Sequence, residues 1–161
     1  MGIPLWENLF RPRPEWQDQA AAMLAETPIF APVPRKTLRR LVESMHLRPY
    51  QDGETVFAVG EPGLGMYLVL SGEVNIELNQ QSLARLSAGD FFGEIALFGE
   101  EVRTATAVAE GPTQLVAFFR PDLEEWLERS PETGVKLLLQ LGHVLAQRLR
   151  KTNERLMRAE G

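Results

Sequence analysis

The middle of the chain alternates short apolar segments with turn-forming stretches, and this pattern restricts the possible folds more than any other feature. About eight segments rich in β-branched, aromatic and aliphatic residues lie between residues 46 and 119. The stretches QDGE, GEPGLG, NQQ, SAGD and AEGP separate them. Short strands at spacings of roughly ten residues are typical of closed or double-sheet antiparallel architectures. The sequence therefore predicts an antiparallel jelly-roll β-barrel of about eight strands.

Helical patterns flank this β region on both sides. Before it, one segment places Leu38, Leu41, Val42 and Met45 on a single helical face. After it, Pro121 and Pro131 stand where first helical turns accept proline. We therefore predict a mainly β fold with flanking helices, and divide the chain into three parts. These are an N-terminal helical extension (1–28), a β-barrel with flanking helices (29–130) and a long C-terminal helix (131–161).

The C-terminal helix carries two apolar stripes of different length. The short stripe is formed by Leu137, Leu141 and Val144. The long stripe repeats like a coiled-coil seam and consists of Val135, Leu138, Gly142, Leu145, Leu149, Thr152 and Leu156. We expect the short stripe to pack on its own domain and the long one to form a homodimer with a second copy. The alternative is a lone amphipathic helix that folds back on its own domain.

Composition excludes several classes of protein. The chain has no cysteine, so disulfides and thiolate zinc sites are ruled out. No apolar run approaches the ~20 residues of a membrane span. The net charge of −5 argues against a broad nucleic-acid surface, and the basic residues near 35–40 and 148–158 are interpreted as solvated helix faces. The sequence predicts a soluble, cytoplasmic protein without a membrane or nucleic-acid partner.

The stretch from Phe91 to Ala109 places one acid, Glu94, nine positions before one base, Arg103. A single helical turn at FGEIALFG would expose backbone N–H groups near Ile95 and Ala96 that suit an anion. Arg103 would grip phosphate oxygens with its planar fork of donors. Glu94 would accept a hydrogen bond from a hydroxyl beside that phosphate. The alternative is that Glu94 and Arg103 simply pair with each other.

This stretch resembles the phosphate-binding cassette of cyclic nucleotide-binding domains. The family pattern is F-G-E-x-A-L, a short variable stretch, and then R-[TSA]-A. The chain has FGEIAL at 92–97 and RTA at 103–105, without departure. The resemblance extends over about residues 29 to 157. Gly65 departs from the Asp of many members, and we expect this to affect turn structure rather than ligand contact.

The resemblance implies a role for each residue of the cassette. Glu94 would accept from the ribose 2′-hydroxyl, and Arg103 would bind the cyclic phosphate. Further phosphate contacts would come from the amides of Gly93, Ala96 and Ala105 and from the hydroxyl of Thr104. Ile95 would line the pocket.

The long helix also resembles the dimer helix of the catabolite activator protein group. By that resemblance, Thr152 would cap the adenine amino group within its own subunit. Asn153 would reach the base across the dimer. The alternative for Thr152 is a polar seam residue that sets register.

The predicted function is a cyclic nucleotide sensor. Thr152 favours cyclic AMP as the ligand, although the Thr104 hydroxyl is compatible with cyclic GMP as well. No cofactor or metal is implied, and His46 and His143, the only histidines, form no catalytic constellation, so we expect no enzyme. The alternative is a protein-interaction or dimerisation scaffold that keeps the fold but binds no nucleotide.

The C-terminal end of the sequence bears on what such a sensor would act on. Transcription factors of the resembled group continue into a winged helix-turn-helix, whereas this sequence ends at Gly161. We therefore expect a stand-alone sensor or a regulatory fragment that does not bind DNA by itself. A protein effector is the candidate partner on which it would act.

Overall fold

The computed structural model describes residues 13–99 and 101–161. It contains four α-helices, a short 3-10 helix and six β-strands over these residues. The helices are α1 (Glu15–Glu26), α2 (Arg35–Glu43), α3 (Arg120–Arg129) and α4 (Pro131–Ala159), and the 3-10 helix is η2 (Glu94–Leu97). The strands are β1 (His46–Tyr50), β2 (Thr55–Phe57), β3 (Gly65–Leu78), β4 (Gln81–Leu86), β5 (Phe91–Phe92) and β6 (Thr106–Phe119). The predicted combination of an antiparallel β region with helices on both sides is confirmed.

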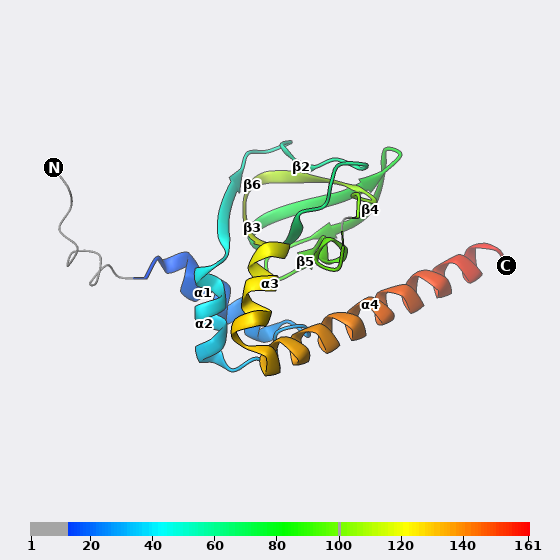
Figure 1. Ribbon diagram of the computed structural model, residues 1–161. Coiled ribbons are helices and arrows are strands. Elements are labelled where there is room, and N and C mark those ends of the chain that lie inside the picture. Colours follow the sequence, from blue (N-terminus) through cyan, green and yellow to red (C-terminus); the bar gives the residue numbers. More distant parts are fainter. Residues whose placement is uncertain (1–12, 100) are drawn as a thin grey trace.

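The sheet is organised around two long antiparallel strands, β3 and β6 (Figure 1). Beside the first half of β3 and the second half of β6, the sheet is extended by β5 and β1. Beside their other halves it is extended by β4 and β2. Every pairing is antiparallel. The two long strands thus connect two parts of the sheet, and the second part carries the site described below.

The structure has six strands rather than the predicted eight or so. Two pairs of predicted strands are continuous in β3 and β6. The turn expected at AEGP lies inside β6, where the β3–β6 ladder has register shifts. Gly72 has φ +85°, and a Cβ there would lie 2.5 Å from the Pro112 carbonyl oxygen. The glycine is therefore needed where two backbones approach closely in a bulge, and not for a turn.

The larger hydrophobic core lies between the sheet and the helices. It takes side chains from all four α-helices and from β3, β5 and β6. On α2, the predicted face is buried, with Leu38, Leu41 and Val42 at most 1% exposed. Ala20 and Leu24 of α1 belong to the same core, so α1 is packed into the domain.

A smaller core lies on the other face of β3. Successive side chains of a strand point to opposite faces, so Met66 and Leu68 enter the larger core while Tyr67 and Val69 enter the smaller one. Phe57 packs against this smaller core. Phe57 and Phe92 of this core also line the candidate site.

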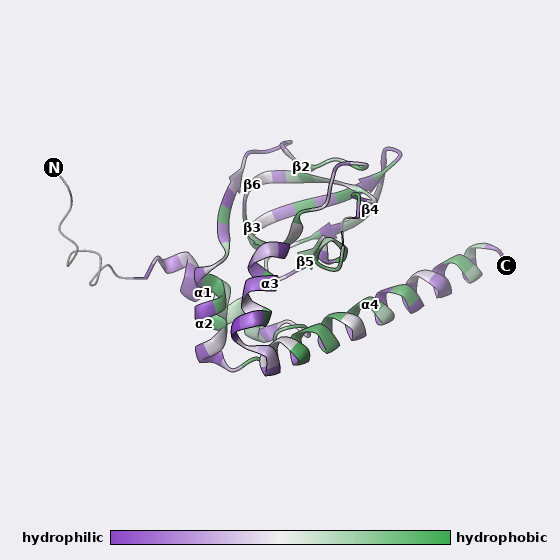
Figure 2. Ribbon diagram, viewed as in Figure 1, coloured by the Kyte–Doolittle hydropathy of each residue, from purple (hydrophilic) through white to green (hydrophobic). Residues whose placement is uncertain are grey.

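The helix α4 leaves the helical cluster and ends far from α1 and α2 (Figure 1). The short apolar stripe is buried as predicted, with Leu137, Leu141 and Val144 at 0%, 1% and 6% exposure. The long stripe is largely uncovered, and hydrophobic segments continue along α4 well beyond the helical cluster (Figure 2). None of the helices in the described part of the chain combines the length and apolar character needed to cross a membrane.

Candidate functional site

A cavity of about 390 Å³ lies between the second part of the sheet, the segment 91–105 and α4. We call the segment 91–105 the cassette. Of the nine predicted site residues, eight line this cavity: Gly93, Glu94, Ile95, Ala96, Arg103, Thr104, Ala105 and Thr152. Asn153 is exposed and lies outside the lining. Residues that are about 60 positions apart in the sequence therefore meet in one place.

Arg103 is buried at this cavity and forms no ion pair with any acid of the described residues. Its residue exposure is 6%, and no carboxylate oxygen of the described residues lies within 4 Å of it. Its Nη2 donates to the Gly65 carbonyl at 2.8 Å and its Nη1 donates to the Gly93 carbonyl at 3.3 Å. Its Nε is buried and has no partner among the described atoms. The site therefore holds a buried cation that no carboxylate of the described residues contacts.

Burial also acts on the charge of Arg103. Desolvation lowers the pKa of the guanidinium from its ordinary value, although the charged form persists at neutral pH. The Phe57 ring lies under the guanidinium, with 4.0 Å from Cζ to the ring centroid. A cation is attracted to the face of an aromatic ring, so Phe57 holds the group in position without neutralising it.

Two glycines allow Arg103 to lie where it does. Gly93 has φ +76°, and a Cβ there would lie 2.7 Å from Arg103 Nη1. A Cβ on Gly65 would lie 2.2 Å from the Phe118 carbonyl oxygen. The Gly65 carbonyl that accepts from Arg103 belongs to the backbone, so this contact does not depend on the residue type at position 65, and the expected effect of the departure on turn structure stays a prediction.

The cassette makes the predicted single helical turn, η2. Its backbone is less available than the sequence suggested, since the Ala96 amide already donates to the Gly93 carbonyl at 3.3 Å. Ile95 is 46% exposed at the rim of the cavity. The turn therefore presents an apolar side chain to the cavity, while one of its expected free amides is engaged.

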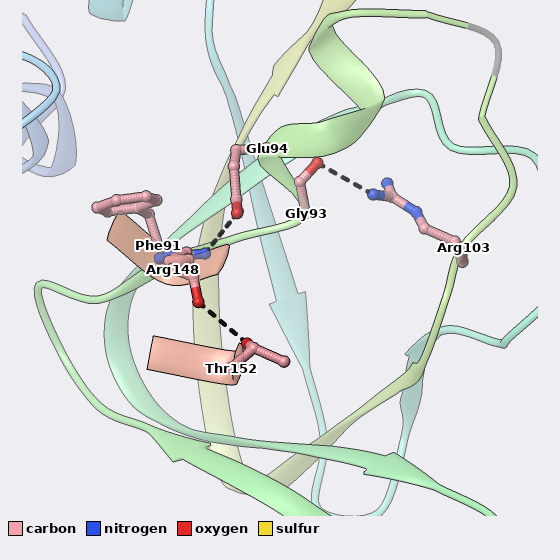
Figure 3. A network of polar contacts seen from close by, with 6 residues as sticks. All are labelled: Phe91, Gly93, Glu94, Arg103, Arg148 and Thr152. Atoms are coloured by element: carbon pink, nitrogen blue, oxygen red, sulfur yellow. Dashed lines mark hydrogen bonds and ion pairs between the residues drawn. The ribbon is translucent and has the colours of Figure 1, made fainter. Parts of the chain in front are cut away.

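Glu94 pairs with Arg148 of α4, and not with Arg103 (Figure 3). Glu94 is 4% exposed, and its Oε1 accepts from Arg148 Nη1 at 2.5 Å. Arg148 also donates to the Phe91 carbonyl at 3.2 Å and lies over the Phe91 ring, with 4.6 Å from Cζ to the centroid. The alternative of a Glu94–Arg103 pair is therefore wrong, and α4 is tied to the cassette through Glu94.

Sequence reasoning missed three cations of α4 that line the cavity, namely Arg148, Lys151 and Arg155. They were interpreted as part of a solvated face. The available signal was spacing, because residues three and four apart lie on one side of a helix and these three bracket Thr152. The apolar wall opposite, formed by Ile76, Ala84 and Leu86, was missed as well.

The arrangement combines three kinds of surface. Arg103 can neutralise one anionic group, Glu94 can accept from a hydroxyl, and the wall of β3 and β4 can pack against an apolar ring. Thr152 donates its hydroxyl to the Arg148 carbonyl at 3.0 Å, so its oxygen is left as an acceptor. A ligand with an anion, a neighbouring hydroxyl and a flat ring system fits this chemistry.

Known proteins that are similar to the chain are described by their binding of, or activation by, cyclic nucleotides. A sequence model described as "Cyclic nucleotide-binding domain" matches residues 47–130. The chain is 33% identical over 139 residues to a CRP-like cAMP-activated global transcriptional regulator of Mycobacterium tuberculosis. This match covers 83% of the chain and 60% of that regulator, so the chain spans only part of its length.

Solved structures agree in fold. The crystal structure of the Thermus thermophilus catabolite activator protein superposes with a TM-score of 0.73 at 32% identity, over 83% of this chain and 63% of that one. A cyclic nucleotide-binding domain from Methylobacillus flagellatus superposes with a TM-score of 0.78 at 25% identity, over 90% of this chain and 84% of that one.

Proposed function

The chain belongs to the cyclic nucleotide-binding domain family, and we propose that it binds cyclic AMP in the cavity between the cassette and α4. In this proposal Arg103 binds the cyclic phosphate and Glu94 accepts from the ribose 2′-hydroxyl. The amides of Gly93 and Ala105 and the Thr104 hydroxyl assist at the phosphate, and the Ala96 amide joins them by giving up its hydrogen bond to the Gly93 carbonyl. Ile95 packs at the rim. Cyclic GMP is the competing ligand.

The observation that carries the proposal is the buried guanidinium of Arg103, which forms no ion pair with a carboxylate of the described residues. A buried charge is costly unless it is paired, so the site is stabilised when an anion enters. A cyclic phosphate diester carries a single negative charge, which one guanidinium neutralises. If Arg103 were paired with Glu94, its charge would already be neutralised within the protein. The structure would then favour the alternative of a scaffold that binds no nucleotide.

The base preference rests on Thr152. Because its proton is committed to the Arg148 carbonyl, its oxygen can accept from the amino group of adenine. The guanine oxygen at the corresponding position is itself an acceptor and would oppose it. This supports cyclic AMP over cyclic GMP.

Calorimetric titration with cyclic AMP and cyclic GMP tests the proposal, with Arg103→Ala as the main variant. Removing one partner of a desolvated charge pair costs about 2–5 kcal/mol, which is at least ~30-fold in affinity. Arg103→Lys keeps the charge but loses the fork, so it should bind between the two. Thermal melting without nucleotide checks that each variant folds. No binding of either nucleotide to folded, nucleotide-free wild type would favour the scaffold reading.

The second part of the proposal is a homodimer through α4. Val135, Leu149 and Leu156 of the long stripe are 56%, 61% and 58% exposed. Apolar side chains repeated along one helix face are stabilised when a second helix covers them. In the dimer, Asn153 of each copy would reach the ligand of the other, and ligand contact with α4 would pass to the dimer. Light-scattering molar mass, with and without Leu149→Glu, tests this part.

A further inference from the structure

Two of the cations on α4, Lys151 and Arg155, line the cavity without a described role in it. Both are exposed, and neither has a carboxylate within 4 Å among the residues of 13–99 and 101–161. They lie four positions apart on either side of Thr152, so one face of α4 carries both toward the cavity. Their charge therefore faces the space through which a ligand enters.

The other two cations at the cavity have a partner or a place in the proposed complex. Arg148 is paired with Glu94. Arg103 would neutralise the single charge of a cyclic phosphate. Besides Glu94, Glu101 is the carboxylate in the described lining, so among the described residues the cavity has four cations and two carboxylates. An excess of positive charge thus remains at the mouth after the ligand is bound.

The whole chain has the opposite sign. Its formal net charge is −5, so at long range it repels an anionic nucleotide. A local field of opposite sign at the mouth of a cleft raises association rates, and it acts over about 10 Å at 0.1 M salt. Positive charge at the entrance therefore attracts an anionic ligand before the ligand contacts the protein.

We propose that Lys151 and Arg155 form a cationic entrance that captures the anionic ligand and speeds its association, without holding it once bound. The inference rests on the proposed function, because it requires an anionic nucleotide as the ligand. It assigns to these residues a kinetic role that is separate from the phosphate contact of Arg103.

Stopped-flow binding of a fluorescent cyclic AMP derivative tests the proposal. The double variant Lys151→Gln with Arg155→Gln should associate roughly three- to tenfold more slowly at low salt, with an unchanged dissociation rate. The difference should shrink toward none near ~1 M salt, where the screening length is about 3 Å.

The matched control is Lys136→Gln with Arg150→Gln. It removes the same charges from α4 at two exposed positions that do not line the cavity. This control should change the association rate by less than about half as much, because steering depends on charge near the entrance.

The outcomes distinguish a failure of the proposed function from a failure of the cationic entrance. If wild type fails to bind the derivative and unlabelled cyclic AMP, the proposed function fails. If wild type binds and the two double variants associate equally slowly, net charge acts alone and the entrance is wrong. Faster dissociation of the Lys151/Arg155 variant would equally overturn it, since these residues would then hold the bound ligand.

Discussion

The two halves of α4 belong to one continuous helix but have opposite surroundings. In residues 131–145, Gly134, Leu137, Leu141 and Val144 are buried in the larger core. In residues 146–159, every residue is exposed. In the described structure the second half is tied to the domain by Arg148, through Glu94 and Phe91. The first half is held by packing and the second by polar contacts at the cavity.

Because of this difference, the first half of α4 contributes mainly to the stability of the domain, and the second half can respond to a ligand. A helix segment with few buried contacts has a low local free energy of opening, so it can be moved at small cost. A ligand that contacts the cassette, Arg148 or Thr152 therefore acts on the half that the core does not hold. In the proposed dimer, a displaced second half would act on the helix of the other copy.

The variants Leu141→Ala and Leu149→Ala compare the two halves of α4, and the first has the largest effect that we expect on the free energy of unfolding. Leu141 is 1% exposed, and truncating a buried leucine lowers the free energy of unfolding by about 2–5 kcal/mol. Leu149 is 61% exposed, so its truncation should change that free energy by no more than about 0.5 kcal/mol in the monomer. Urea unfolding at low protein concentration measures both. Equal losses at low concentration would mean that the second half is packed as well.

Arg148→Ala should have the next largest effect, because it leaves Glu94 buried without its cation. Unpairing a buried group lowers the free energy of unfolding by about 1–3 kcal/mol, and we expect the lower end. The reason is that the Arg148 side chain is 45% exposed, so solvent screens part of the interaction. Urea unfolding measures this loss, and hydrogen exchange should show less protection in 148–159. Arg150→Ala is the control. Unchanged exchange in Arg148→Ala would show that another contact holds the second half.

The same helix shows how far the sequence could lead. Burial of Leu137, Leu141 and Val144 could be predicted, because helical periodicity depends only on the order of residues. The pairing of Glu94 with Arg148 could not, since it joins positions 54 apart whose contact depends on the path of α4. An exposed arginine in a basic stretch has the same local sequence whether it is solvated or paired.

The cassette and the sheet teach a related lesson. The resemblance of the stretch around Glu94 and Arg103 to a phosphate-binding cassette predicted that both lie at one site, but the spacing alone did not decide whether they pair with each other. The local sequence at Gly72 fits a strand end as well as a bulge, and the structure places it in a bulge inside β3. A glycine with positive φ looks the same in sequence in both cases, and only the partner strand distinguishes them.

Thr152→Ala tests the contact of the second half with the ligand. Loss of one neutral hydrogen bond should weaken cyclic AMP binding by about 1 kcal/mol, and cyclic GMP binding by less. Thr152→Val keeps the shape without the hydroxyl and should behave in the same way. Titration calorimetry with both nucleotides measures the difference. Equal losses for the two ligands would remove the argument for adenine recognition.

Gly142→Ala should have the smallest effect, and it probes the long stripe where the two halves of α4 meet. A Cβ at Gly142 would have no atom within 4 Å, so alanine fits the monomer. Because glycine inside a helix is about 0.8–1 kcal/mol less favourable than alanine, the monomer should become slightly more stable. In a dimer that brings two backbones together at Gly142, the added methyl would instead weaken association. Urea unfolding and sedimentation at several concentrations separate the two effects, and an unchanged dimer constant would place the helix contact away from Gly142.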